Sequence, residues 1–114
     1  MADDIVYVNF DDGVKRVMGN AKFYVKMLVK FKDNGSLNEL EAAFASGDME
    51  KSQTAVHTLK GLAGNLSFTE LYNQCLELET QIKTKSVNPD QITVIKNVHT
   101  LTLAEVDKVI AENA

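Results

Sequence analysis

Apolar residues recur at helical spacing along most of the chain, and this spacing predicts helices separated by short polar breaks. The predicted helices span residues 11–18, 21–32, 36–47, 48–66, 69–85 and 89–112. Short breaks between long amphipathic helices favour antiparallel neighbours. We therefore expect an all-α fold, an up-and-down four-helix bundle with one additional short helix.

Most predicted helices begin at a polar residue whose side chain can accept a hydrogen bond from a free backbone N–H group of the first turn. The last begins at a proline, which has no N–H group and so leaves none unpaired there. The candidates are Asp11 or Asp12, Asn20, Ser36 with Glu39 in a capping-box pattern, Asp48, Thr69, and Pro89 in the first turn of the last helix. Ahead of them, residues 5–10 contain five apolar side chains in a short extended pattern. A lone strand has no sheet partner in such a fold, so we expect this segment to cover the bundle.

Four apolar stripes are expected to form the core. Cys75 falls in the stripe of helix 69–85 and is most simply a core residue. Val98 or His99 falls in the stripe of helix 89–112, and we expect the histidine to lie at its flank or to be half-buried. The stripes are Phe23, Met27, Leu28 and Phe31; Ala55, Leu59, Leu62 and Leu66; Leu71, Cys75, Leu78 and Ile82; and Ile92, Ile95, Val98 or His99, Leu103, Val106 and Ile110.

His57 lies on the face of its predicted helix opposite the apolar stripe. At about 100° per residue, Gln53, Lys60, Gly61 and Gly64 all fall within about 60° of His57 on the helical wheel. A surface histidine without a role is the simplest interpretation, and Gly64 could simply end the helix. Gly61, however, costs about 1 kcal/mol relative to alanine inside a helix. The absence of a side chain there would clear space around the imidazole.

This face suits phosphoryl transfer through nitrogen. An imidazole offers a nucleophilic lone pair near neutral pH, and a nearby lysine can neutralise phosphoryl oxygens. If an acceptor holds the Nδ1–H group of His57, Nε2 faces the incoming phosphorus. Transfer of this kind depends mainly on positioning and charge neutralisation.

Composition narrows the function further. The 114 residues fit a single domain over 1–114, and the net charge of −4 argues against nucleic-acid binding. We expect no membrane span, because no apolar run approaches about 20 residues, and the lack of a secretory signal favours the cytoplasm. Two histidines and one cysteine without metal-ligand spacing argue against a metal site, and the chain has no phosphate-binding glycine loop. A single cysteine also agrees with a reducing compartment.

The segment 55–66, AVHTLKGLAGNL, resembles the signature of histidine-containing phosphotransfer (Hpt) domains of two-component phosphorelays. The likeness extends through Leu71, Cys75 and Leu78-Glu79, and back to residues 10–14 and 19–20. It implies that His57 accepts the phosphoryl group, that Lys60 steadies it, and that Gly61 opens the approach. Glu79 falls where the family often has a glutamine or acidic residue that hydrogen-bonds the imidazole, although a solvated charge is an equal alternative. Ser67 departs from the pattern, because a glycine commonly stands there.

The resemblance implies a phosphorelay intermediate, a carrier rather than an enzyme, which accepts a phosphoryl group from a receiver-domain aspartyl phosphate and passes it to another receiver. The receiver would supply Mg²⁺, so we expect no cofactor on this chain. Partners would be response-regulator receiver domains or a hybrid histidine kinase, with Gln53 and Gly64 in the docking surface. The alternative is an adaptor that docks a receiver or kinase without carrying phosphate. No exposed apolar seam is apparent beyond the core stripes, so we expect a monomer rather than an oligomerisation module.

Overall fold

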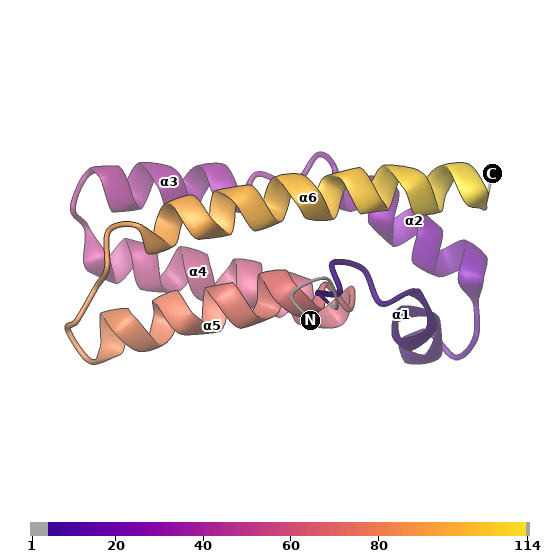
Figure 1. Ribbon diagram of the computed structural model, residues 1–114, viewed down its shortest axis with the longest axis horizontal. Coiled ribbons are helices and arrows are strands. Elements are labelled where there is room, and N and C mark those ends of the chain that lie inside the picture. Colours follow the sequence, from indigo (N-terminus) through magenta and orange to yellow (C-terminus); the bar gives the residue numbers. More distant parts are fainter. Residues whose placement is uncertain (1–4, 114) are drawn as a thin grey trace.

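The computed structural model describes residues 5–113, and over this range the chain folds into six helices (Figure 1). Predicted features at residues 1–4 therefore lie outside the described residues. The helices are α1 (Phe10–Arg16), α2 (Ala21–Phe31), α3 (Ser36–Ala45), α4 (Met49–Asn65), α5 (Thr69–Lys83) and α6 (Gln91–Glu112).

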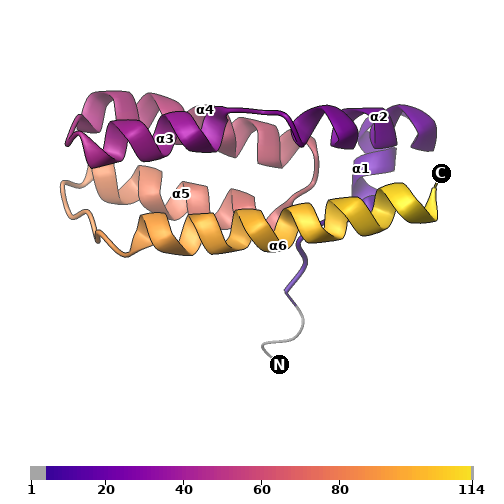
Figure 2. The same ribbon diagram turned by 90° about the horizontal axis from the view of Figure 1, so that it is seen from above.

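The helices form a bundle of four rods. Helices α2 and α3 lie end to end on one side, and the long helix α6 runs beside both of them (Figures 1 and 2). Helices α4 and α5 form an antiparallel pair that packs against α3 and α6 respectively. The short helix α1 lies across the end of the bundle, where it contacts α2. The all-α bundle with an additional short helix is thus confirmed.

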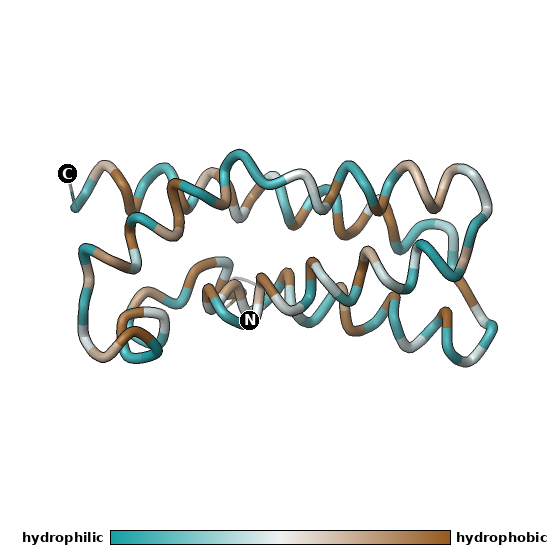
Figure 3. The backbone as a smooth tube through the Cα atoms, turned by 180° about the vertical axis from the view of Figure 1, so that it is seen from behind, coloured by the Kyte–Doolittle hydropathy of each residue, from teal (hydrophilic) through white to brown (hydrophobic). Residues whose placement is uncertain are grey.

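Hydrophobic and hydrophilic residues alternate along each rod of the backbone trace (Figure 3), and the buried apolar residues form one core cluster. The α5 stripe is confirmed, since Leu71, Cys75 and Leu78 are fully buried and Ile82 is 8% exposed. Burial raises the pKa of the Cys75 thiol to about 12, as expected for an inert core cysteine. His99 is half-buried, with its ring 5.6 Å from that of Phe31, which confirms its flanking position.

The other three stripes are confirmed in part, since Leu28, Phe31, Leu59, Leu66, Ile95, Val98 and Val106 are buried as predicted. Their remaining members differ from the prediction. Phe23 is half exposed, and Tyr24 is buried in its place because its hydroxyl donates a 2.6 Å hydrogen bond to the carbonyl of Leu66. In α4 the buried line includes Val56 and Ala63, whereas Ala55 and Leu62 are only partly buried. In α6 it passes through Thr102, whose hydroxyl bonds the Val98 carbonyl, so Leu103 and Ile110 lie at its edge.

Two of the predicted helix caps are confirmed. The side chains of Asn20 and Asp48 each accept a hydrogen bond of 3.0 Å from the backbone N–H three residues later. The cap of α1 is Asn9 rather than Asp11 or Asp12, because its side chain accepts from the N–H of Asp12.

The remaining predicted starts are wrong by one or two residues. Ser36 is the first residue of α3 and not its cap, because the N–H of Glu39 already bonds the carbonyl of Gly35 at 3.0 Å. Thr69 is likewise the first residue of α5. Pro89 lies in the turn before α6, where the N–H of Gln91 bonds the carbonyl of Asn88.

The predicted covering role of residues 5–10 is confirmed in part, because Tyr7, Val8 and Phe10 pack against the core while Ile5 and Val6 are exposed. The backbone of this segment also binds the start of α5 and the turn before it. The Val6 carbonyl accepts the N–H of Glu70 at 3.1 Å, which satisfies a free donor in the first turn of α5. The Asn9 N–H donates to the Ser67 carbonyl at 2.9 Å. Ser67 has a φ of +60°, a conformation that glycine adopts more readily, and its hydroxyl donates a 2.6 Å hydrogen bond to Asp12. The serine thus keeps the turn while it binds α1.

Candidate functional site

His57 lies in the middle of α4, on the side of the helix away from the core. Its side chain is 69% exposed, whereas Val56, Leu59 and Ala63 on the opposite side are fully buried. The sequence prediction of an exposed histidine is therefore confirmed. The burial of the apolar line fixes the rotation of α4 and so fixes where the imidazole emerges.

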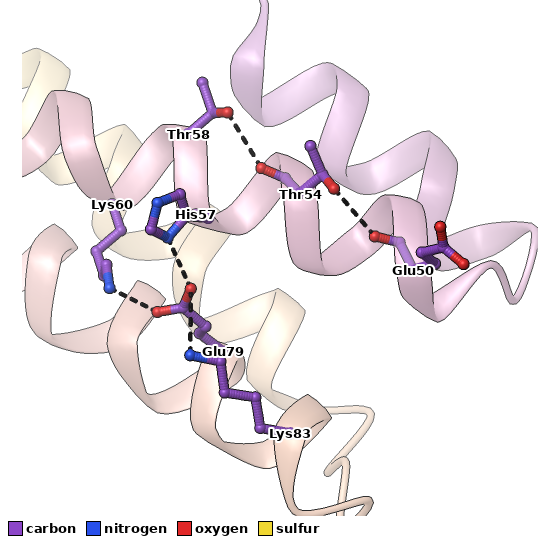
Figure 4. A network of polar contacts seen from close by, with 7 residues as sticks. All are labelled: Glu50, Thr54, His57, Thr58, Lys60, Glu79 and Lys83. Atoms are coloured by element: carbon purple, nitrogen blue, oxygen red, sulfur yellow. Dashed lines mark hydrogen bonds and ion pairs between the residues drawn. The ribbon is translucent and has the colours of Figure 1, made fainter.

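The imidazole contacts a buried carboxylate from the neighbouring helix. Glu79 of α5 is only 3% exposed, and its Oε2 lies 2.8 Å from Nδ1 of His57 (Figure 4). Its other oxygen, Oε1, accepts a 2.6 Å hydrogen bond from Nζ of Lys60. The alternative that Glu79 is a solvated charge is wrong. The two helices bring together three residues that the sequence singled out.

The protonation of this group follows from its contacts. The hydrogen bond from Lys60, followed by that from His57, holds the pKa of Glu79 below its ordinary value, although burial acts in the opposite direction. An ionised carboxylate only accepts hydrogen bonds, so Nδ1 of His57 is the ring nitrogen that carries a proton. In the neutral imidazole, Nε2 then keeps its lone pair, and Figure 4 shows this second nitrogen pointing away from Glu79.

Lys60 is held by the carboxylate rather than extended into water. Its side chain is 18% exposed, and the hydrogen bond to Glu79 raises the pKa of its ammonium group. Lys60 lies near His57, as predicted, because both side chains contact the carboxylate of Glu79. The ammonium group of Lys60 thus lies close to the imidazole while it is paired with the carboxylate of Glu79.

The two glycines differ in what surrounds them. A Cβ built on Gly61 would meet no side chain, whereas one on Gly64 would lie 3.3 Å from the ring of Tyr72. Both glycines lie within α4, which continues to Asn65, so neither ends the helix. Gly61 therefore leaves open space beside His57, and Gly64 lets an aromatic ring of α5 approach the backbone.

Open hollows lie on both sides of the histidine. One of about 490 Å³ is lined by Gln53, His57 and Glu79, together with neighbouring side chains of α4 and α5. The other, of about 460 Å³, is lined by Lys60, both glycines and Tyr72, and reaches α1 at Arg16. The predicted docking residues Gln53 and Gly64 thus flank His57 on opposite sides.

A family model described as the Hpt domain matches residues 31–110, which is more than half of the chain. The chain belongs to the Hpt domain family. Hpt domains carry phosphoryl groups in two-component signalling, act as carriers rather than enzymes, and interact with receiver domains and kinases. Searches of curated proteins and of solved structures gave no match.

Sequence reasoning missed one charged residue of this Hpt domain site. Nζ of Lys83 lies 3.9 Å from Oε2 of Glu79, one helical turn further along α5. Lys83 follows Glu79 by four residues, a spacing that places the two side chains next to each other on a helix. This spacing points to the site only if Glu79 is buried beside His57, which the sequence did not decide.

Among residues 5–113 of this Hpt domain, no helix is both long and apolar enough to cross a bilayer. The same residues contain no group of three or more histidine, cysteine or acidic side chains arranged to hold a metal ion.

Proposed function

We propose that this Hpt domain is a phosphorelay intermediate whose phosphoacceptor is Nε2 of His57. It would receive the phosphoryl group from the aspartyl phosphate of one receiver domain and pass it to the aspartate of another. The observation that carries this proposal is the 2.8 Å contact between Nδ1 of His57 and the buried carboxylate of Glu79. That contact supports a proton on the inner nitrogen, Nδ1, and a nucleophilic lone pair on the outer nitrogen, Nε2.

In the first transfer, the Nε2 lone pair attacks phosphorus and forms the N–P bond while the P–O bond to the receiver aspartate breaks. The aspartate leaves as a carboxylate. The ring keeps its Nδ1 proton and gains positive charge, which the carboxylate of Glu79 stabilises. In the second transfer, the carboxylate of the next receiver attacks phosphorus, the N–P bond breaks, and the lone pair returns to Nε2.

The surroundings of His57 support the same role. Lys60 lies one helical turn from His57, and after a change of rotamer its ammonium group would neutralise phosphoryl oxygens. Gly61 leaves room for a receiver's active-site loops, and we expect the receiver to supply Mg²⁺ and most of the catalytic groups. Gln53 and Gly64 would lie at the docking surface, together with the exposed ring of Tyr72.

The test is incubation with a receiver domain carrying a labelled aspartyl phosphate, followed by chasing with a second receiver. We expect acid-labile, base-stable label on the wild-type chain and on His99→Ala, and none on His57→Ala. Label on His57→Ala at the wild-type level would remove this histidine from the mechanism. A wild-type chain that binds the receiver but stays unlabelled would be an adaptor instead.

A further inference from the structure

Two lysines and one histidine surround the single carboxylate of Glu79. Its Oε1 is bonded by Lys60, while its Oε2 faces both Nδ1 of His57 at 2.8 Å and Nζ of Lys83 at 3.9 Å (Figure 4). The carboxylate is almost completely buried, whereas the Lys83 side chain is 58% exposed. Lys83 is therefore close to the carboxylate but outside hydrogen-bond distance.

The phosphorylated state creates a conflict for Lys60. Nε2 points away from Glu79 (Figure 4), so we expect a phosphoryl group on this nitrogen to draw the ammonium group of Lys60 away from the carboxylate that it now bonds at 2.6 Å. If Lys60 turns towards the phosphoryl oxygens, the buried carboxylate loses its closest cation. The Nδ1–H group of the positively charged ring still pairs with Oε2, but Oε1 loses its donor, and a second cation near the buried carboxylate would offset this loss.

We propose that Lys83 is this second cation, a positioning residue that takes over the charge of Glu79 when Lys60 moves to the phosphoryl group. Lys83 is the one remaining cation within 4 Å of Glu79 among residues 5–113. It lies on the same helix at i+4, and its flexible stem can close the remaining gap of about 1 Å to hydrogen-bond distance. This inference rests on the proposed phosphorylation of His57 and adds a role that the histidine motif itself does not contain.

If Lys83 replaces Lys60 at Glu79, the effect of removing Lys83 should depend on whether Lys60 is present. Without Lys83, Lys60 must stay with Glu79, so the phosphorylated state loses part of its stabilisation. Without Lys60, Lys83 would serve Glu79 in both states, and its removal would no longer distinguish them. A general electrostatic or docking role of Lys83 would instead be the same in either background.

The experiment is a double-mutant cycle on the phosphotransfer equilibrium with a receiver domain, using wild type, Lys83→Ala, Lys60→Ala and the double variant. We expect Lys83→Ala to lower the equilibrium ratio of phosphorylated to free Hpt domain about threefold to fivefold, the size typical of partly exposed ion pairs. The same change in the Lys60→Ala background should have less than about half that effect, and Lys83→Arg should restore the ratio. Lys51→Ala, which removes an exposed lysine near the start of α4, is the control for net charge.

An equal effect of Lys83→Ala in both backgrounds, or no effect, would overturn the proposal. A second measurement separates it from failure of the relay role. Phosphoramidate, a small donor that phosphorylates imidazole directly, loads His57 without a receiver, and NMR of the lysine ammonium groups follows the two lysines. We expect the Lys83 signal to shift on loading in wild type but not in Lys60→Ala. Loading and this shift without transfer from any receiver would contradict the relay function alone, whereas loading without the shift, or no loading, would overturn the lysine exchange.

Discussion

Replacement of Glu79 by glutamine tests how the protein selects the reactive nitrogen of His57. A carboxylate accepts from both of its donors, whereas an amide has one acceptor oxygen and one NH₂ group. In Glu79→Gln, the amide oxygen can therefore serve Lys60 or the Nδ1–H group of His57, but not both. If Lys60 takes the oxygen, the NH₂ group faces Nδ1, which must then accept. This places the imidazole proton on Nε2 and blocks the nucleophile.

The magnitude follows from the two competing hydrogen bonds. A bond from a charged lysine contributes about 1.5–3 kcal/mol and a neutral one about 0.5–1.5 kcal/mol, so Lys60 wins the oxygen by about 1 kcal/mol. The reactive tautomer is then reduced about fivefold. Loss of the negative charge that faces the cationic ring costs about 1 kcal/mol more, because the exposed imidazole is partly screened by water. We expect phosphoryl transfer to His57 to slow roughly 25-fold in total.

The assay is rapid-quench measurement of transfer from a phosphorylated receiver at saturating concentration. Glu77→Gln, which changes an exposed carboxylate of the same helix, is the matched control and should transfer at the wild-type rate. An unchanged rate in Glu79→Gln would refute the role of the carboxylate in holding the Nδ1 proton. A rate loss accompanied by an equal loss in receiver affinity would instead assign Glu79 to docking.

The same variant carries a pH signature in its stability. Because the pKa of Glu79 is lowered in the folded state, its ionised form stabilises the fold fully above its ordinary value of about 4.3. This contribution is lost as the pH falls through the lower folded-state value. The difference in unfolding free energy between wild type and Glu79→Gln should therefore be constant near pH 7 and shrink in acid. Urea unfolding across this range measures it, and a difference that grows in acid would contradict the assignment.

Three other substitutions have clear expected outcomes. Lys60→Ala should slow transfer about tenfold without weakening the unphosphorylated complex, whereas normal transfer with lost affinity in both Lys60→Ala and Lys60→Arg would make this lysine a docking residue. Gly61→Leu should fold at least as stably as wild type, because the added side chain enters open space, yet transfer slowly; unimpaired transfer would show that receivers do not use this space. Ser67→Gly should be about 1 kcal/mol more stable than Ser67→Ala in thermal unfolding. Both variants lose the hydrogen bond to Asp12, but only glycine removes the steric strain of the left-handed backbone conformation, so equal stabilities would contradict this.

The sequence predicted what depends on local periodicity. The exposed position of His57 and the buried α5 stripe follow from residue spacing within one helix, and the caps Asn20 and Asp48 act within three residues of themselves. Each of these features is determined by a short segment, so a single sequence is sufficient to predict it.

The missed features depend on contacts between distant segments. Tyr24 is buried because its hydroxyl reaches a carbonyl 42 residues away, and the N–H of Glu70 is satisfied by the N-terminal segment. Neither partner is visible in a local pattern. The burial of Glu79 was undecided for the same reason, since it depends on α4 supplying His57 and Lys60 to pair with its charge.

The central claim is that Nδ1 of His57 holds its proton against Glu79 while Nε2 accepts phosphorus. The most direct test is NMR of the chain labelled with ¹⁵N in its histidine rings after transfer from a phosphorylated receiver. We predict phosphorus–nitrogen coupling at Nε2 of His57, with a proton still bound to Nδ1. Coupling at Nδ1 of His57, or at either nitrogen of His99, would contradict the account.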